Sequence, residues 1–211
     1  MVVKDGHVLR LWKTLYGPKQ SPREWNANLD NYMIKMKYKR ITADSCVYIR
    51  STNSSIVIIA VYVDDLIIAG SSLSLVESVK AEFHRKYKMK DLGKLQYVLG
   101  VRVDQNPAQK TIQLSQQTYI LDMLTKFNMT DCRVVDTPME SKIKLSKSMA
   151  PTTPQGRKDM EQYPYREAVG SLLWIANGTR PDIAYAVSQV AKYMSNPGLP
   201  HWIAVKRILQ Y

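Results

Sequence analysis

Asp64 and Asp65 are the residues of this sequence whose type and spacing most clearly allow chemistry. They separate two strongly apolar runs, residues 56–63 and 66–69. Neighbouring side chains of a strand point to opposite faces, so an unbroken buried strand would place at least one of the two charges in the core. A tight turn at Val63 and Asp64 would instead lift both carboxylates to the tip of a hairpin. The sequence therefore predicts a β-hairpin that presents two carboxylates.

Two carboxylates this close repel each other unless a cation lies between them. Mg²⁺ (or Mn²⁺) is the natural candidate, because a hard cation prefers oxygen ligands. Such ions serve phosphoryl transfer by activating the attacking hydroxyl and by holding the leaving pyrophosphate. The alternative is an ordinary solvated hairpin turn, since Asp is common in turns. A bare pair of aspartates leaves both interpretations open.

The hydrophobic pattern predicts the elements that would position this hairpin. Ser21 and Pro22 are typical of a helix start, with Ser21 as the N-cap and Pro22 in the first turn. Trp25 follows on the apolar face of that helix, where a core anchor is favoured over a nucleic-acid stacker. Further along the chain, stretches with a strand-like apolar pattern alternate with stretches whose apolar residues recur at the helical period of 3.6 residues. The expected elements are a strand-like stretch at 7–12, the helix from Ser21, strands at 47–49, 56–63 and 66–69, a helix at 73–90, a hairpin of 96–103 with 111–114, and a helix at 115–127.

The last third of the sequence differs in composition. Residues 131–164 hold several Pro, Ser, Thr and Lys with little apolar periodicity, which indicates a linker or an ordered loop. Trp174 and Tyr185 lie on apolar helical faces and are expected in the core, whereas His84 and His201 are expected at the surface. Three helical stretches complete the chain, at 165–177, 181–195 and 200–211.

Composition narrows the class of partner. Thirty Lys and Arg against 18 Asp and Glu leave a formal charge of +12, which favours a polyanionic partner such as a nucleic acid. A merely basic surface is the alternative. Cys46 and Cys132 lie far apart, with neither metal-ligand spacing nor a disulfide framework. Without a signal peptide or an apolar run long enough to span a bilayer, we expect an intracellular protein, in a cytoplasmic particle or the nucleus, that is not secreted and has no membrane partner.

The sequence YVDDL at 62–66, with apolar runs on both sides, resembles the catalytic hairpin of reverse transcriptases. Other segments agree with it in order and spacing. They are LYGPKQSPREW at 15–25, DLGKLQYVLG at 91–100, YREAVGSLLW at 165–174 and TRPDIAYAV at 179–187. Together they resemble the reverse transcriptase domain of the copia-type (Pseudoviridae) LTR retrotransposon Pol polyprotein. A chance match in a structural protein is disfavoured, because four ordered segments would have to coincide.

The resemblance implies roles for individual residues. Asp64 and Asp65 would be the second and third carboxylates of the polymerase triad and would bind Mg²⁺ or Mn²⁺, with Asp64 the firmer ligand. The positions implied to lie near the incoming nucleotide and template are Gly17, Lys19, Gln20, Ser21 and Pro22. Those implied to lie near the primer are Tyr62, Val63, Leu99 and Gly100. An RNA or DNA template-primer and a dNTP would be the partners.

The resemblance also implies an architecture of the α+β class. Residues 1–130 would form part of the fingers and of a right-hand polymerase palm, an antiparallel sheet with flanking helices. Residues 131–164 would be a linker. Residues 165–211 would be a helical, thumb- or connection-like segment that precedes the RNase H position.

One carboxylate of the family triad has no counterpart in this sequence. The family carries it on a strand upstream of the Gly17 segment, where Asp5 is the only aspartate and its surroundings do not match. Two-metal catalysis needs carboxylates on both ions. We therefore expect a reverse transcriptase fragment that is inactive by itself. The alternative is a host-retained remnant that binds nucleic acid or a partner without catalysis.

Overall fold

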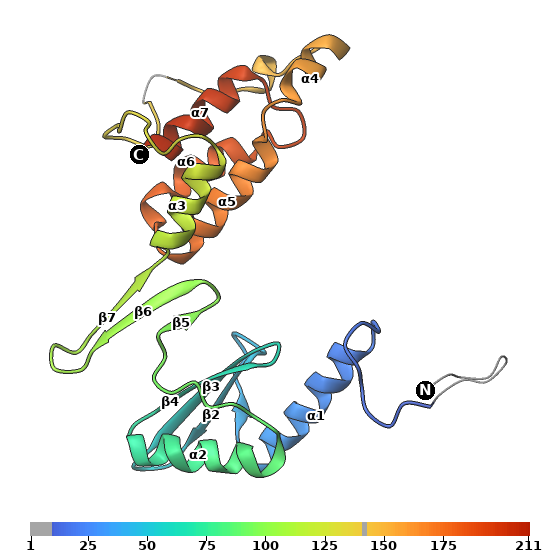
Figure 1. Ribbon diagram of the computed structural model, residues 1–211, viewed down its shortest axis with the longest axis vertical. Coiled ribbons are helices and arrows are strands. Elements are labelled where there is room, and N and C mark those ends of the chain that lie inside the picture. The colour runs from blue at the N-terminus through green and yellow to red at the C-terminus, as the bar shows by residue number, and fades with distance from the viewer. Residues whose placement is uncertain (1–9, 141–142) are drawn as a thin grey trace. The chain divides into compact units, whose positions relative to one another are not determined.

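The computed structural model describes residues 10–140 and 143–211 and divides the chain into two compact units, Met1–Gly93 and Lys94–Tyr211 (Figure 1). The chain is α+β, as predicted, with two small antiparallel sheets, flanking helices and a helical C-terminal segment. Within the strand-like stretch predicted at 7–12, residues 7–9 lie outside the described residues and residues 10–12 form no strand. The helices of the described residues include none that is long and apolar enough to cross a membrane.

The first unit is built on a four-stranded antiparallel sheet in sequence order. Its strands are β1 (Lys39–Arg40), β2 (Val47–Ser51), β3 (Ile56–Tyr62) and β4 (Asp65–Gly70). The register pairs Ile49 with Ile58 and Ile58 with Ala69, so alternate residues line each face. The strands predicted from the β-branched runs are confirmed.

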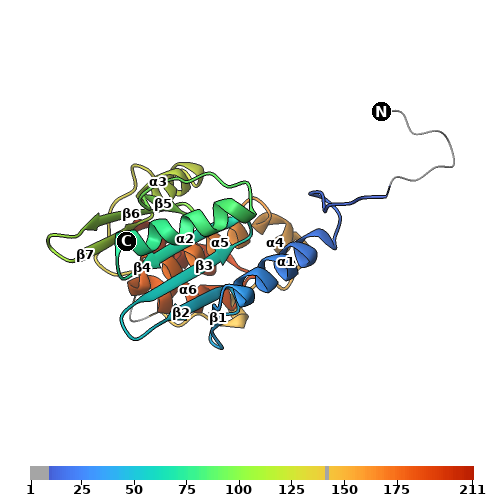
Figure 2. The same ribbon diagram turned by 90° about the horizontal axis from the view of Figure 1, so that it is seen from below.

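Two helices cover one face of this sheet (Figures 1 and 2), α1 (Ser21–Lys35) and α2 (Leu73–Lys86). Apolar residues recur every three or four positions in both helices, which places them on the face that meets the sheet. The buried residues of this core are Leu29, Met33, Tyr38, Tyr48, Val57, Ile59, Val79 and Phe83. Helix α2 ends four residues before the predicted position 90, because Tyr87 adopts an extended conformation and its ring packs back against α1.

The predicted N-cap at Ser21 is wrong. Gln20 precedes the first helical residue, and Ser21 is already part of α1 and buried. The Ser21 hydroxyl donates a hydrogen bond of 2.6 Å to the carbonyl of Leu15 instead of capping the helix. Pro22 lies in the first turn as predicted. Ser21 therefore ties the preceding segment to the start of α1.

The second unit begins with a three-stranded antiparallel sheet of β5 (Tyr97–Val98), β6 (Val101–Asn106) and β7 (Thr111–Ser115). The prediction of one strand over 96–103 is wrong, because a tight turn at Leu99 and Gly100 divides it. Both residues have positive φ, +51° and +76°, the pattern of a type I′ hairpin turn. Gly100 adopts this conformation without steric cost, so the chain can reverse there.

Helices form the rest of the second unit around a core of their own. They are α3 (Gln117–Lys126), α4 (Pro154–Met160), α5 (Tyr165–Gly178), α6 (Ala184–Ala191) and α7 (Leu199–Gln210), with 3₁₀ turns η1 (Lys147–Met149) and η2 (Pro181–Ile183). The centre of this core holds Val169, Leu172, Ile175, Val187, Val190 and Val205. The core positions predicted for Trp174 and Tyr185 are wrong, since these side chains are 43% and 72% exposed. Both helices bury the smaller residues of the opposite face instead.

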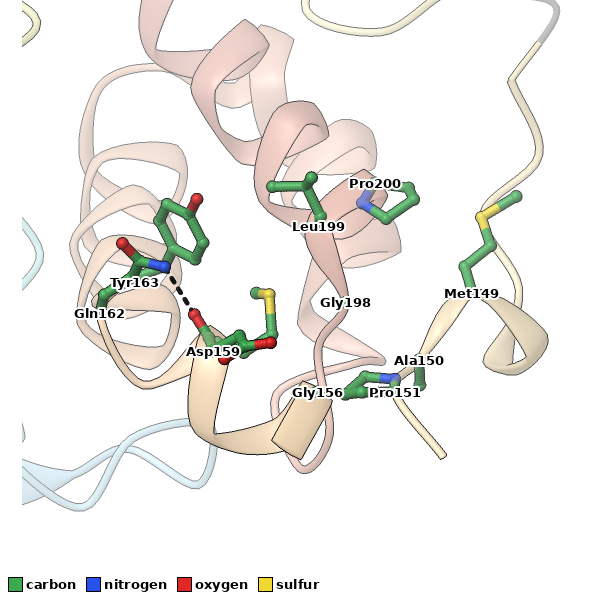
Figure 3. A pocket seen from close by; sticks show the side chains of 11 residues that line it. Met149, Ala150, Pro151, Gly156, Asp159, Gln162, Tyr163, Gly198, Leu199 and Pro200 are labelled. Carbon is green, nitrogen blue, oxygen red and sulfur yellow. Dashed lines mark hydrogen bonds between the residues drawn. The ribbon is translucent and has the colours of Figure 1, made fainter. Parts of the chain in front are cut away.

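Parts of the segment between α3 and α5 contact α7 and the residues that follow α6. The Arg207 guanidinium donates hydrogen bonds of 3.0 Å to Glu140 and to Thr137, and the Tyr193 hydroxyl donates one of 2.7 Å to the Leu145 carbonyl. Where η1 and α4 meet the start of α7, a hollow of about 370 Å³ remains (Figure 3). Thr137, Glu140 and Leu145 of this segment are therefore tied to the helical part of the second unit.

His201 is buried, so its predicted place at the surface is wrong. Its Nδ1 accepts a hydrogen bond of 2.8 Å from the Gly198 N–H, and its Nε2 lies 3.1 Å from the Ser146 carbonyl. A carbonyl can only accept, so Nε2 carries the proton and the ring is neutral. The ring of Tyr193 stacks on it at 4.1 Å between centroids. Because both ring nitrogens have partners, burial of this polar side chain costs little.

We expect the stability of the second unit to depend on pH through His201. Burial lowers its pKa below the ordinary value of 6.5. Below pH 6.5 the unfolded chain therefore binds more protons than the folded one. As the pH is lowered from 6.5, the free energy of unfolding decreases by at most about 1.4 kcal/mol for each pH unit. Above pH 6.5 this contribution is complete. Urea unfolding between pH 5 and 8 measures the dependence.

His84 is the matched control, because it is exposed on α2. The His201→Gln protein should lose the decline between pH 6.5 and 5, whereas His84→Gln should keep it. An unchanged pH profile in His201→Gln would contradict the assignment.

Candidate functional site

The predicted hairpin is present. Strands β3 and β4 pair as far as Tyr62 with Asp65, which leaves Val63 and Asp64 as a two-residue turn. Tyr62, Val63, Asp64 and Asp65 are all exposed. The turn thus resolves the conflict between two adjacent charges and two apolar strands, and both carboxylates reach solvent at one end of the sheet.

The turn is strained at Val63. This residue has φ +53°, whereas φ at Asp64 is not positive. A positive φ at the first central position alone is the pattern of a type II′ hairpin turn, which favours Gly there. A β-branched side chain in this region costs on the order of 1–3 kcal/mol, and such a conformation persists only where surrounding contacts hold it.

Trp25 supplies one such contact. Its indole N–H donates a hydrogen bond of 2.8 Å to the carbonyl oxygen of Val63, across 38 residues of sequence. The ring packs against the core of the first unit, as predicted, and meets Tyr87 edge-to-face at 5.5 Å between centroids. The contact to Val63 was not predictable from the sequence. The available signal was only that a packed indole N–H usually finds an acceptor.

The segment predicted to lie near the nucleotide immediately precedes α1. Gly17 has φ +114°, a conformation that favours glycine, and a Cβ there would meet no atom within 4 Å. Lys19 and Gln20 are exposed, and the Ser21 N–H donates to the Pro18 carbonyl at 3.1 Å. The structure thus places this segment in the same unit as Asp64 and Asp65, with Pro22 opening the helix that carries Trp25.

Leu99 and Gly100 belong to the second unit. They form the exposed turn between β5 and β6, with both φ angles positive. Their location near the primer stays a prediction.

The donor chemistry of Asp64 and Asp65 fits a hard divalent cation, because both are exposed carboxylates on neighbouring residues. Across residues 10–140 and 143–211, no group of three or more His, Cys, Asp or Glu side chains could hold a metal ion. Two carboxylates are a partial ligand set, because Mg²⁺ takes about six oxygen ligands.

Comparison with known proteins gives the family context. The family described as "Reverse transcriptase (RNA-dependent DNA polymerase)" matches residues 2–141. The chain is 41% identical to the retrovirus-related Pol polyprotein from transposon TNT 1-94 of Nicotiana tabacum, over 99% of this chain and 16% of that protein. It is 36% identical to the Pol polyprotein from transposon RE1 of Arabidopsis thaliana, over 99% of this chain and 14% of that protein.

A shorter relative matches over most of its length. The chain is 36% identical to a putative transposon Ty5-1 protein of Saccharomyces cerevisiae, over 97% of this chain and 64% of that protein. The chain thus spans only a small part of the long polyproteins it resembles. No solved structure gives a significant match.

Proposed function

Since this chain belongs to the reverse transcriptase (RNA-dependent DNA polymerase) family and its relatives are copia-type Pol polyproteins, we propose that it supplies the catalytic hairpin for RNA-directed DNA synthesis in a longer parent protein. The observation that carries the proposal is the exposed Asp64–Asp65 pair on the β3–β4 turn. Nucleotidyl transfer to a primer on an RNA or DNA template is the proposed reaction, and a dNTP is the proposed substrate. The proposed setting is an intracellular retroelement particle or the nucleus.

Asp64 and Asp65 would hold the divalent cations, Mg²⁺ or Mn²⁺. Such ions, when bound, favour attack by the primer hydroxyl and stabilise the charge on the leaving pyrophosphate. The chain would hold these carboxylates in a fixed position, so that they need not reorganise at the moment of reaction. Charges that are fixed in advance contribute most to a reaction rate. The paired ends of β3 and β4 provide that rigidity.

Residues around the hairpin would orient the substrates. Tyr62 and Val63 would lie beside the primer terminus, with Leu99 and Gly100 as part of the primer grip. The segment from Gly17 to Pro22 would approach the nucleotide and template, since an unhindered glycine allows close approach of a ligand to the backbone. Basic side chains, in excess by 12 charges, would bind the phosphate backbone.

In this proposal residues 1–130 form part of the fingers and of the polymerase palm, residues 131–164 are a linker, and the helices of residues 165–211 are the thumb- or connection-like segment. Strand β4 supports the assignment of the palm. Among the described residues it pairs only with β3, so its other edge is free to accept a strand. A strand that brings the first carboxylate of the triad would fit there.

Primer extension tests the proposal. We define the extended polymerase as these residues preceded in frame by the upstream part of the parent Pol protein. On an RNA template with Mg²⁺ or Mn²⁺, the extended polymerase should incorporate nucleotides, whereas the 211 residues alone should not. Incorporation by the 211 residues alone would contradict the partial ligand set. Binding of template-primer without extension by the extended polymerase would favour a nucleic-acid-binding remnant instead.

A further inference from the structure

Helix α1 reaches the catalytic turn through the hydrogen bond from the Trp25 indole N–H to the Val63 carbonyl, 2.8 Å long. We propose that Trp25 is a positioning residue, which holds the Val63–Asp64 peptide in the orientation that directs the Asp64 carboxylate toward its cation. This inference rests on the proposed function, because it assigns Trp25 a role in the metal site.

The peptide between Val63 and Asp64 needs such support. Its carbonyl belongs to Val63, whose φ of +53° is unfavourable for a β-branched residue. A rotation about the N–Cα bond of Val63 would relieve its positive φ, and it would at the same time swing the Val63 carbonyl and the backbone from which the Asp64 side chain extends. The hydrogen bond from Trp25 opposes that rotation, because it fixes the carbonyl end of the peptide.

Trp25 is itself held in place by an aromatic cluster from α1 and the end of α2. The ring of Tyr87 meets that of Trp25 edge-to-face at 5.5 Å between centroids. The ring of Tyr87 also meets that of Tyr32 edge-to-face, at 5.4 Å between centroids. The Tyr87 hydroxyl donates a hydrogen bond of 2.9 Å to Asn28, and the Tyr32 hydroxyl donates one of 2.8 Å to the Glu82 carbonyl. Both hydroxyls therefore have partners, and burial raises the pKa of each above its ordinary value. The indole nitrogen is thus presented from a rigid support.

The same helix carries the segment assigned to the nucleotide. Ser21, at the first helical position, is one turn before Trp25 and bonds back to the Leu15 carbonyl. A single rigid helix therefore connects the Lys19–Pro22 turn with the Val63–Asp64 turn. This arrangement fits a role for Trp25 in the relative position of nucleotide and metal, beyond its packing in the core.

Replacement of Trp25 by β-(3-benzothienyl)alanine tests the role, because this analogue keeps the ring shape and lacks the N–H donor. In the 211-residue chain, the Asp64 backbone amide should show new exchange broadening by NMR. In the extended polymerase, the apparent Mg²⁺ requirement should rise by about two- to ten-fold, the usual effect of one lost hydrogen bond. The same replacement at exposed Trp174 is the matched control and should change neither measurement.

Combining the Trp25 replacement with Val63→Gly provides a second test of the inference. Glycine accepts a positive φ without support, so the metal effect of the Trp25 replacement should be clearly smaller in the Val63→Gly background. An equal effect in both backgrounds, or no effect of the Trp25 analogue on metal requirement and Asp64 exchange, would overturn the inference. The proposed function fails separately, if Asp64→Asn leaves metal-dependent extension intact.

Discussion

Asp64→Asn in the extended polymerase should lower the rate of nucleotide incorporation by about 10²–10³-fold or more, the scale on which loss of one preorganised electrostatic contact affects a rate. Asparagine has nearly the same shape and is well tolerated in turns. The exposed position of Asp64 on the β3–β4 turn makes no demand on the core. The substitution therefore removes a negative charge from the proposed metal site while leaving the fold intact.

Three measurements separate a loss of metal binding from other causes. Single-turnover incorporation gives the rate, titration with Mn²⁺ gives the metal requirement, and a filter-binding assay gives the affinity for template-primer. We expect the first to fall, the second to rise and the third to change little. Asp65→Asn should show the same pattern with a smaller loss. Asp122→Asn, on the exposed face of α3, is the charge-matched control. Wild-type rates in Asp64→Asn would refute the metal role.

Gly198→Ala should destabilise the second unit by about 2–3 kcal/mol, the upper part of the range for overpacking. Gly198 precedes α7 and has φ −109°, which any residue can adopt, so backbone conformation is not the cause. The cause is space, because an added Cβ would overlap the carbonyl oxygen of Met149 and lie 3.0 Å from its carbonyl carbon. Backbone atoms cannot swing aside as a flexible side chain can. The loop at Met149 and Ala150 would have to separate from Gly198, at the hollow shown in Figure 3.

Gly170→Ala is the matched control for this prediction. Gly170 lies within α5, is exposed, and has no atom within 4 Å of an added Cβ. Alanine there should stabilise the helix by about 0.5–1 kcal/mol. Urea unfolding followed by tryptophan fluorescence measures the stability, and Trp202, whose ring lies 5.6 Å from that of Tyr163, contributes the signal from the same region. Equal stability of Gly198→Ala and wild type would contradict the packing argument.

The hairpin and most helices and strands were predictable, because their signals are local. The continuous run of β-branched and apolar residues at 56–63 and the three- and four-residue spacing after Ser21 are each signals contained within one short stretch of sequence. The predictions of burial that failed depend on which parts of the chain pack together. His201 is buried because the Ser146 carbonyl, 55 residues earlier, satisfies its second nitrogen. Trp174 is exposed because α5 buries its opposite face.

At the β3–β4 turn, some features follow from the sequence alone and others from the tertiary structure. The sequence by itself determined that two carboxylates stand between apolar strands, since no buried strand accepts them both, and so it determined the hairpin. Only the tertiary structure decided how that turn is held. Val63 has an unfavourable positive φ, and its carbonyl accepts a hydrogen bond from Trp25 on a different element. That contact depends on where α1 packs on the sheet, and packing geometry follows from the whole core rather than from any one stretch of residues.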